Sequence, residues 1–201
     1  MQAIDTPSSV VGNVHNVVTS GFHGFLRYIS PDTKNFPRKQ LRAAEAASIL
    51  SVPGTGIGMV FENDPTSVDY FQEGKGTDDA NVAIANAAAA GAPKTAPIFF
   101  AVDYDATTDN IQGPILTYFQ EVHAAMDAAG ILTGIYGSGE ACEAMKQAGV
   151  AHFTWLAQSR GWSGFLKWKP KADIIQGPGA TVAGLDVDTD FVVNEAVLWT
   201  A

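Results

Sequence analysis

The sequence predicts an α/β fold, a single (β/α)8 TIM-like barrel that is compact and has some short or missing helices. Three observations predict it. Short apolar runs alternate with helical patterns from Phe25 onward, which is typical of βα units and a parallel sheet. Eight strand segments are found, and eight strands close a parallel barrel. The chain has 201 residues, which is near the lower limit for this fold, so several helices must be short.

The expected strands are short segments, most of them apolar runs between the helical patterns. The last connection, GPGATVAG, is too short to hold a helix. In chain order, the strands are predicted at residues 3–5, 25–29, 58–62, 97–103, 133–137, 153–158, 173–176 and 184–187.

The expected helices lie between these strands, with Asp or Ser near their starts and Gly at several ends, as helix caps require. They are predicted at residues 37–50, 78–90, 110–129 and 139–149. The period of 3.6 residues is clearest in the third of them. No internal repeat or linker interrupts the pattern, so we expect one domain over residues 1–201.

Composition excludes several classes of partner. The net charge is -9 and the twelve basic residues are scattered, so nucleic acid would be repelled and is not an expected partner. The start of the chain has neither the basic nor the apolar region of a signal peptide, and no run is long enough to span a membrane. We therefore expect the chain as given to be soluble, without a membrane partner.

Cofactor and nucleophile motifs are also missing. The glycines of PGTGIGMV precede a strand, which indicates a turn and not a dinucleotide loop. The four histidines lack ligand spacing, so we expect no metal and no cofactor. Cys142 has no cysteine partner and is expected to be an inert, half-buried thiol. Ser138 has no paired His and is expected to start a helix.

In a (β/α)8 barrel the functional residues lie at the carboxyl ends of the strands. Asp103 and Asp105 are two residues apart, so an extended strand would place them on one face, roughly 6.6–6.8 Å apart at Cα. Two such carboxylates suit glycoside hydrolysis, in its retaining or inverting form. Carboxylates dominate the predicted strand ends, which are Asp5, Arg27 and Tyr28, Glu62, Asp103 and Asp105, Tyr136, Gln158, Gln176, and Asp186 with Asp188.

Several stretches resemble a bacterial glycoside-hydrolase-like barrel domain of unknown function that is related to the family 25 muramidases, which are lysozyme-type enzymes. These stretches cover most of the chain and are FLRYIS, YFQEGKGTDDANVAIANAAAAGAPKTAPIFFAVDYD, GIYGSG, WLAQSRGW, DIIQ and GLDVDTDF. The resemblance implies a barrel with a carbohydrate-type cleft. It implies that this cleft is lined by Asp5, Glu62, Asp103, Asp105, Gln176 and Asp186.

One position departs from the muramidases, which carry Asp-x-Glu at the end of the fourth strand where this chain has Asp103-Tyr104-Asp105. The shorter Asp105 brings its carboxyl back by about 1.5 Å, and misplacements near 1 Å can cost about a hundredfold in rate. Glu62, at an apolar rim, could supply the long carboxylate instead, with a raised pKa. The alternative role for Glu62 is an ion pair with Arg27.

For a catalytic site, we expect Glu62 or Asp105 to donate a proton and Asp103 to act as nucleophile, base or electrostatic stabiliser. Aromatic side chains near the strand ends can stack on sugar rings, whereas Trp155 is expected to belong to the core. The expected substrate-binding residues are Asp5, Arg27, Tyr104, Tyr136, Trp162, Gln176 and Asp186, of which Asp5 and Asp186 could also tune pKa values.

Three functions are compatible with this pattern. The first is a glycosidase that acts on a cell-wall type polysaccharide, such as peptidoglycan, without a cofactor. The second is a glycan-binding barrel without turnover, and the third is a glycosyltransferase in which Asp103 and Asp105 hold Mg²⁺ or Mn²⁺. A wall-directed role would place the chain outside the cytoplasm. The sequence identifies neither the glycan nor a protein partner.

Overall fold

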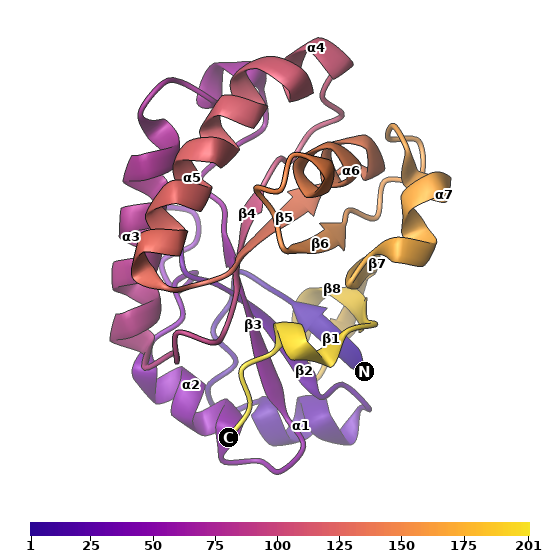
Figure 1. Cartoon of the computed structure of the whole chain (residues 1–201). Coiled ribbons are helices and arrows are strands. Elements are labelled where there is room, and N and C mark those ends of the chain that lie inside the picture. The colour runs from indigo at the N-terminus through magenta and orange to yellow at the C-terminus, as the bar shows by residue number, and fades with distance from the viewer.

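The computed structural model describes residues 1–201, and its eight strands close into a barrel in the order of the sequence (Figure 1). This arrangement, with helices packed around the strands, confirms the predicted α/β barrel. The strands are β1 Gln2–Asp5, β2 Gly24–Tyr28, β3 Gly56–Phe61, β4 Ile98–Ala101, β5 Thr133–Gly137, β6 Phe153–Leu156, β7 Ile174–Val182 and β8 Leu185–Val192.

The helices are short except on one side of the barrel, where α3 and α5 pack side by side (Figure 1). The α-helices are α1 Val14–Thr19, α2 Ala43–Leu50, α3 Lys75–Ala90, α4 Thr108–Asn110, α5 Leu116–Ala129, α6 Gly139–Gln147 and α7 Phe165–Trp168. Short 3-10 turns are η1 Val68–Tyr70, η3 Lys169–Lys171 and η4 Glu195–Val197, and η2 Ile111–Ile115 joins α4 to α5. None of the helices is long and apolar enough to cross a membrane.

The last strand runs against its neighbours, which corrects the prediction of an all-parallel barrel. β8 pairs antiparallel with both β7 and β1, whereas the other neighbours are parallel. A parallel return needs a crossover of a dozen or more residues, which this connection does not have. Instead, Ala183 and Gly184, with φ of 52° and 80°, form a two-residue hairpin turn. β7 and β8 are therefore longer than predicted.

The first predicted helix, 37–50, is also corrected, because α2 begins only at Ala43. Upstream, the chain lies against β2: the Leu41 N–H donates to the Tyr28 carbonyl at 2.7 Å, and Gln40 forms a bridge with Tyr28. Those backbone bonds keep residues 37–42 out of a helix. The helices α1 and α7 are short and were not predicted.

Two apolar clusters stabilise the barrel. The larger one fills the space between strands and helices. The smaller one fills the barrel interior and consists of Ala3, Leu26, Val60, Phe99, Trp155, Ile174, Val192, Val197 and Leu198. Glycines make room in this narrow interior, because a Cβ on Gly58 or Gly134 would lie 2.5 Å from Leu26 or Phe99, respectively. The interior is thus a packed core below the mouth, as expected for Trp155.

Three smaller predictions are settled by the structure. Ser138 caps α6 and accepts a hydrogen bond from the Ala141 N–H at 3.2 Å, as expected for a helix start. Gly54 lies in a turn before β3, with a φ of 80°. Cys142 is completely buried, not half-buried, and this burial raises the pKa of its thiol.

Candidate active site

A cleft of about 310 Å³ opens at the mouth of the barrel, where the parallel strands end. Its walls combine carboxylates with aromatic and amide side chains. The lining residues are Asp5, Tyr28, Val60, Glu62, Asp103, Tyr136, Trp155, Gln158, Ser159, Trp162, Gln176 and Asp188. Six residues that the sequence predicts for the site therefore come together here: Asp5, Glu62, Asp103, Tyr136, Trp162 and Gln176.

Gln176 connects the polar residues of the cleft. Its Nε2 donates to Asp5 Oδ2 at 3.0 Å and to Asp188 Oδ2 at 3.4 Å. Its Oε1 accepts from the Tyr136 hydroxyl at 2.9 Å and from the Gln158 backbone N–H at 3.2 Å. A backbone N–H can only donate, so this contact fixes the orientation of the amide. Gln176 therefore holds two carboxylates on the same side of the cleft.

Asp5 is almost fully buried at the end of β1, and this burial raises its pKa to about 6. The nearby Asp188 raises the pKa further, whereas the hydrogen bonds from Gln176 and Tyr28 oppose the increase. The Tyr28 hydroxyl donates a hydrogen bond to Asp5 Oδ1 at 3.3 Å. Asp5 is thus a carboxyl group that changes charge near neutral pH.

Asp190 lies deeper in the barrel, next to Asp5. Its Oδ1 accepts a hydrogen bond from the Trp155 indole N–H at 2.9 Å, but its buried Oδ2 has no hydrogen-bond partner. Burial, followed by the charge of Asp5 and a hydrogen bond between the two side chains, raises the pKa of Asp190 well above its usual value. A buried carboxyl oxygen beside a carboxylate needs a proton. The raised pKa favours the protonated form of Asp190, which lies next to the Asp5 carboxyl group.

Glu62 and Asp103 lie on the neighbouring strand ends of β3 and β4. Burial is the main cause that raises the pKa of each, and the charge of Asp103 adds to the increase for Glu62. Lys39 opposes both shifts, because its Nζ lies 3.3 Å from Glu62 Oε1 and also donates to the Glu62 carbonyl at 2.9 Å. Burial outweighs this single cation, so both groups titrate above their usual range.

Asp105 and Tyr104 lie outside the cleft, contrary to the prediction. β4 ends at Ala101, and the chain then bends away, so Asp103 and Asp105 do not share one face of a strand. Asp105 is exposed and accepts the Ser163 N–H at 2.8 Å. Tyr104 packs its ring against Phe71 at a centroid distance of 6.3 Å. The two Asp carboxylates therefore do not converge on one point.

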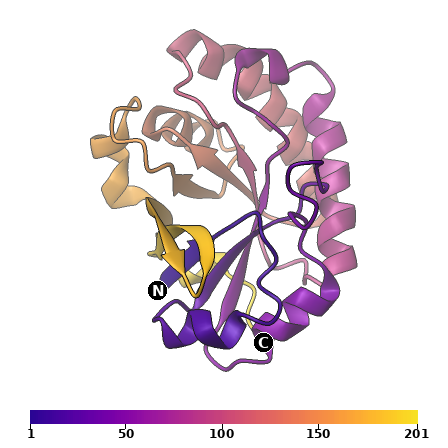
Figure 2. The ribbon, with the colours of Figure 1, turned by 180° about the vertical axis from the view of Figure 1, so that it is seen from behind.

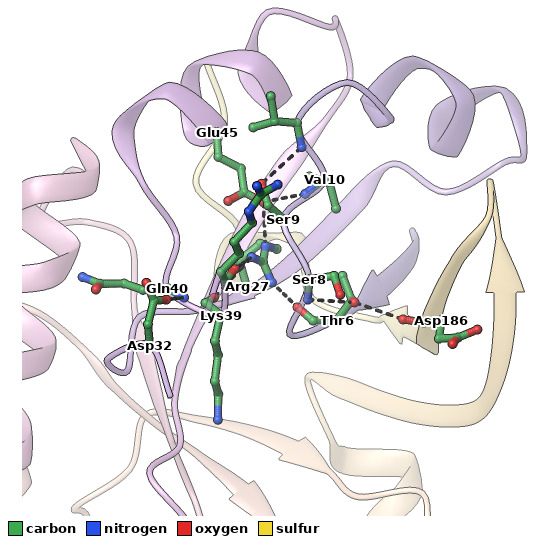
Figure 3. A network of polar contacts seen from close by, with 12 residues as sticks. Thr6, Ser8, Ser9, Val10, Arg27, Asp32, Lys39, Gln40, Glu45 and Asp186 are labelled. Atoms are coloured by element: carbon green, nitrogen blue, oxygen red, sulfur yellow. Dashed lines mark hydrogen bonds and ion pairs between the residues drawn. The ribbon is translucent and has the colours of Figure 1, made fainter. Parts of the chain in front are cut away.

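Arg27 is likewise not a cleft residue, and it does not pair with Glu62. Its side chain points to the outside of β2, where it is completely buried and donates from Nε to Glu45 on α2 at 2.9 Å (Figure 3). It also binds the carbonyls of Thr6 and Lys39. Arg27 is thus a structural cation that fixes the loops after β1 and β2. The ion pair with Glu62 that was predicted for Arg27 is formed by Lys39 instead.

Asp186 also lies outside the cleft, because β8 is antiparallel. The strand enters from the hairpin tip, where Asp186 is exposed and accepts from Thr181 at 3.3 Å. Its carbonyl accepts from Thr6, as Figure 3 shows. The alternation of β8 then brings Asp188 to the rim and Asp190 into the interior.

Sequence reasoning missed two charged residues at the site, Asp190 and Lys39. Asp190 belongs to the alternating acids of DVDTD, and this period of two was a detectable signal for a strand with acids on one face. Lys39 carried no such signal, since it lies in a loop that was predicted as helix. No group of three or more His, Cys, Asp or Glu side chains is arranged to hold a metal ion.

Solved structures with the same fold include Rv2525c, a Tat-secreted protein of Mycobacterium tuberculosis crystallised with L-tartrate. It is 19% identical, with a TM-score of 0.82 over 96% of this chain and 95% of that one. The autolysin LytC of Streptococcus pneumoniae, crystallised with a synthetic peptidoglycan ligand, is 14% identical, with a TM-score of 0.59 over 94% of this chain and 46% of that one. The catalytic domain of an endolysin from a Listeria monocytogenes bacteriophage is 14% identical, with a TM-score of 0.58 over 98% of this chain and 95% of that one.

Sequence relatives include two uncharacterized proteins of Bacillus subtilis (strain 168). YbfG is 31% identical over 130 residues, which are 61% of this chain and 18% of that protein. FadG is 26% identical over 151 residues, which are 73% of this chain and 26% of that protein. The matched part thus spans about a quarter or less of these relatives. The family described as Rv2525c-like, glycoside hydrolase-like domain matches residues 15–192. The chain therefore belongs to the Rv2525c-like glycoside hydrolase-like domain family.

Proposed function

We propose that this chain is a glycosidase that binds and cleaves a cell-wall type polysaccharide, such as peptidoglycan, in the cleft at the barrel mouth. The observation that carries the proposal is the set of carboxyl groups in this cleft, Asp5, Glu62, Asp103 and Asp188, whose pKa values are all raised. Glycoside hydrolysis requires one protonated and one ionised carboxyl group on opposite sides of a bond. An autolysin and an endolysin share the fold, which supports a wall glycan as substrate.

In the proposed mechanism, Glu62 donates its proton to the glycosidic oxygen, and the leaving sugar departs as an alcohol. Asp103 remains ionised and faces the positive charge that develops at the anomeric carbon. It either attacks this carbon or accepts the proton of an attacking water molecule. Asp5 and Asp188, held by Gln176, contact the substrate and adjust the charge of the cleft. With Asp105 turned away, Glu62 is the proton donor of this proposal.

The walls of the cleft suit a sugar chain. Trp162 is half-buried at the rim, so its ring can cover one face of a sugar. The Tyr136 hydroxyl and the Gln158 backbone N–H both donate to Gln176, and the polar side chains of Tyr136 and Gln158 line the cleft, where sugar hydroxyls could bind them. Aromatic faces and directed polar groups are what carbohydrate binding uses, so these walls support a glycan as the ligand of the cleft.

Glycan binding without cleavage is the second candidate. It is favoured by Asp105, which is one methylene shorter than the Glu of the related muramidases and accepts a backbone N–H outside the cleft. In this case the same residues would hold the sugar, but no proton donor would reach the glycosidic oxygen. The transferase alternative has less support, because Asp103 and Asp105 do not converge on a metal position.

The test is the release of reducing ends from purified peptidoglycan. The wild-type protein should release them, and Glu62→Gln and Asp103→Asn should each lower the rate by at least about a hundredfold. Asp186→Asn is the matched control, because it makes the same chemical change outside the cleft, and it should keep the wild-type rate. Binding of the polysaccharide without release would support the second candidate, and absence of both would refute the proposal.

A wall-directed activity also implies that the chain works outside the cytoplasm. The Tat-secreted description of Rv2525c supports this proposal. Fractionation of cells that produce the natural protein, with detection by antibody, should find it in the wall or the medium. Its retention in the cytoplasm would contradict this part of the proposal.

A further inference from the structure

A second and larger cavity, of about 610 Å³, lies beside the cleft on the outer face of the last strands. Figure 2 shows the hairpin of β7 and β8 at the near side, with no helix in front of it. The register places Phe191 next to Gln2 of β1 on one side and Ile175 of β7 on the other. All three, together with Phe165 of α7, line this groove. We call the cavity the β7–β8 groove.

The β7–β8 groove contains two cations without acidic partners. Arg160 and Lys169 both line it, are exposed, and form no ion pair within 4 Å. Asp190 is the single acid among the lining residues, and its side chain is buried, whereas the two cations are exposed. In a chain with 21 acidic and 12 basic residues, two free cations in one groove are an uncommon concentration of positive charge.

The β7–β8 groove and the cleft are neighbours. Gln158 and Gln176 line both cavities, so they form the border between them. The charges differ across this border: the cleft holds Asp5 and Asp188, and the groove holds the two cations. A glycan in the cleft can therefore extend a substituent over Gln158 into the groove.

We propose that the β7–β8 groove is a subsite for an anionic substituent, a carboxylate or a phosphate, on the glycan that binds in the cleft. This inference rests on the proposed function. Arg160 and Lys169 donate charge-assisted hydrogen bonds to the anion, and the Gln2 amide adds a neutral donor. The rings of Phe165 and Phe191, the latter 48% exposed, contact the apolar part of the substituent. The subsite selects charged over neutral glycans.

The test compares three probes by calorimetry at low salt: a neutral chitooligosaccharide, an oligosaccharide of equal length that contains N-acetylmuramic acid, and a glycerol phosphate oligomer. The variant is Arg160→Gln with Lys169→Gln. The matched control is Lys34→Gln with Lys94→Gln, which removes the same charge from two exposed lysines that form no ion pair and lie outside the groove. Thermal melting confirms that both double variants are folded.

We expect the wild type to bind the carboxylate-bearing oligosaccharide at least about fivefold more tightly than the neutral one, as two exposed ion pairs allow. The groove variant should lose this preference with an unchanged Kd for the neutral probe, and the control should keep it. Equal binding of both probes by the wild type overturns the inference. It is also overturned if the preference survives in the groove variant or disappears in the control.

The phosphate probe separates the two sources of the anion. If its affinity depends on Arg160 and Lys169 more strongly than that of the carboxylate probe, the natural substituent is a phosphate, and the reverse result indicates a carboxylate. If no oligosaccharide binds at all, the proposed function fails, and the anion site in the groove is then tested by the glycerol phosphate oligomer alone. Its binding to the wild type but not to the groove variant then supports the anion site, and no binding overturns it.

Discussion

Gln176 uses all four of its hydrogen-bonding positions inside the cleft, which makes it the residue that fixes the relative positions of Asp5 and Asp188. Its amide nitrogen donates hydrogen bonds to both carboxylates and so holds them at a fixed separation. Two carboxylates that are held in place before a ligand binds lower the entropy cost of binding. The sugar contacts of the proposal thus depend on an amide that does no chemistry itself.

Replacing Gln176 by Glu should therefore destabilise the protein at neutral pH. The change removes both donors to Asp5 and Asp188 and adds a further acid beside them, at a cost of roughly 2–4 kcal/mol in the free energy of unfolding. Protonation of the new Glu near pH 4.5 should reduce the loss. Urea unfolding at pH 7 and 4.5 measures this, with Gln120→Glu on the exposed face of α5 as the control. An equal effect of Q176E at both pH values would contradict the assigned network.

Asp190→Asn should leave the pH profile of the site unchanged, because the Asn amide can donate to Asp5 while its oxygen still accepts from Trp155. Asp190→Ala should instead lower the free energy of unfolding by roughly 1–3 kcal/mol, since it leaves the buried Trp155 N–H unpaired. The measurements are glycan turnover against pH and thermal unfolding. A profile shifted by Asp190→Asn would show that Asp190 is ionised in the native protein.

The sequence predicts cleft residues well where the strand end and its direction are predicted correctly. Asp5, Glu62, Tyr136 and Gln176 lie in or next to strands that pair parallel with a neighbour, and all four line the cleft. Asp105 does not, because the actual end of β4 depends on a tertiary contact, the Asp103 N–H with the Pro65 carbonyl at 3.0 Å. The sequence pattern around Asp103 cannot predict that contact, because Pro65 is distant in the sequence. Arg27 was misplaced for another reason, since its alternation points it outward to a buried partner, Glu45.

At the scale of elements, β8 decides the shape of the site. Because β8 runs antiparallel to its neighbours, the chain enters it at the hairpin and passes Asp188 before Asp190. The hairpin also replaces a crossover helix, so the outer face of β7 and β8 has no helix over it and lines the β7–β8 groove. The short GPGATVAG connection already excludes a crossover helix, and the positive φ of Ala183 marks the hairpin, which was not predicted. The strand direction could thus have been predicted from the loop length alone.

The interior of the small barrel depends on glycine at specific strand positions. A Cβ at Gly134 would lie 2.5 Å from the Phe99 ring, so Gly134→Ala should destabilise the protein by roughly 1–3 kcal/mol through overpacking. Chemical unfolding measures this cost. Gly161→Ala is the matched control, because a methyl group added at Gly161 would have no atom within 4 Å, and the change should be nearly neutral. Equal effects of the two changes would contradict the packed interior.

For the molecule as a whole, the raised pKa values predict that the free energy of unfolding increases when the pH is lowered from neutral. Five acids, Asp5, Glu62, Asp103, Asp188 and Asp190, have raised pKa values, so the native state binds more protons than the unfolded state above pH 4. Under this condition the free energy of unfolding falls as pH rises. His152 and Asp32 both have lowered pKa values and oppose this trend. Each of them contributes stability that is lost as the pH falls.

The thermal midpoint should accordingly be higher at pH 5 than at pH 7.5, and the net charge of -9 adds to this direction because protonation reduces self-repulsion. Asp5→Asn should raise the midpoint at pH 7.5 more than at pH 5, since it removes a buried acid whose pKa is about 6. Differential scanning calorimetry of both proteins at the two pH values checks this. A wild-type midpoint that increases toward pH 7.5 would contradict the shared burial of these acids.

We propose that a wall glycan lies in the cleft with its scissile bond between Glu62 and Asp103, which both line it. The most direct measurement is a crystal structure of the Asp103→Asn variant soaked with a peptidoglycan oligosaccharide. We predict a sugar ring against Trp162, with the glycosidic oxygen within hydrogen-bond distance of the Glu62 carboxyl group. A sugar bound elsewhere on the barrel, or one in the cleft with its glycosidic oxygen beyond the reach of Glu62, would contradict the account.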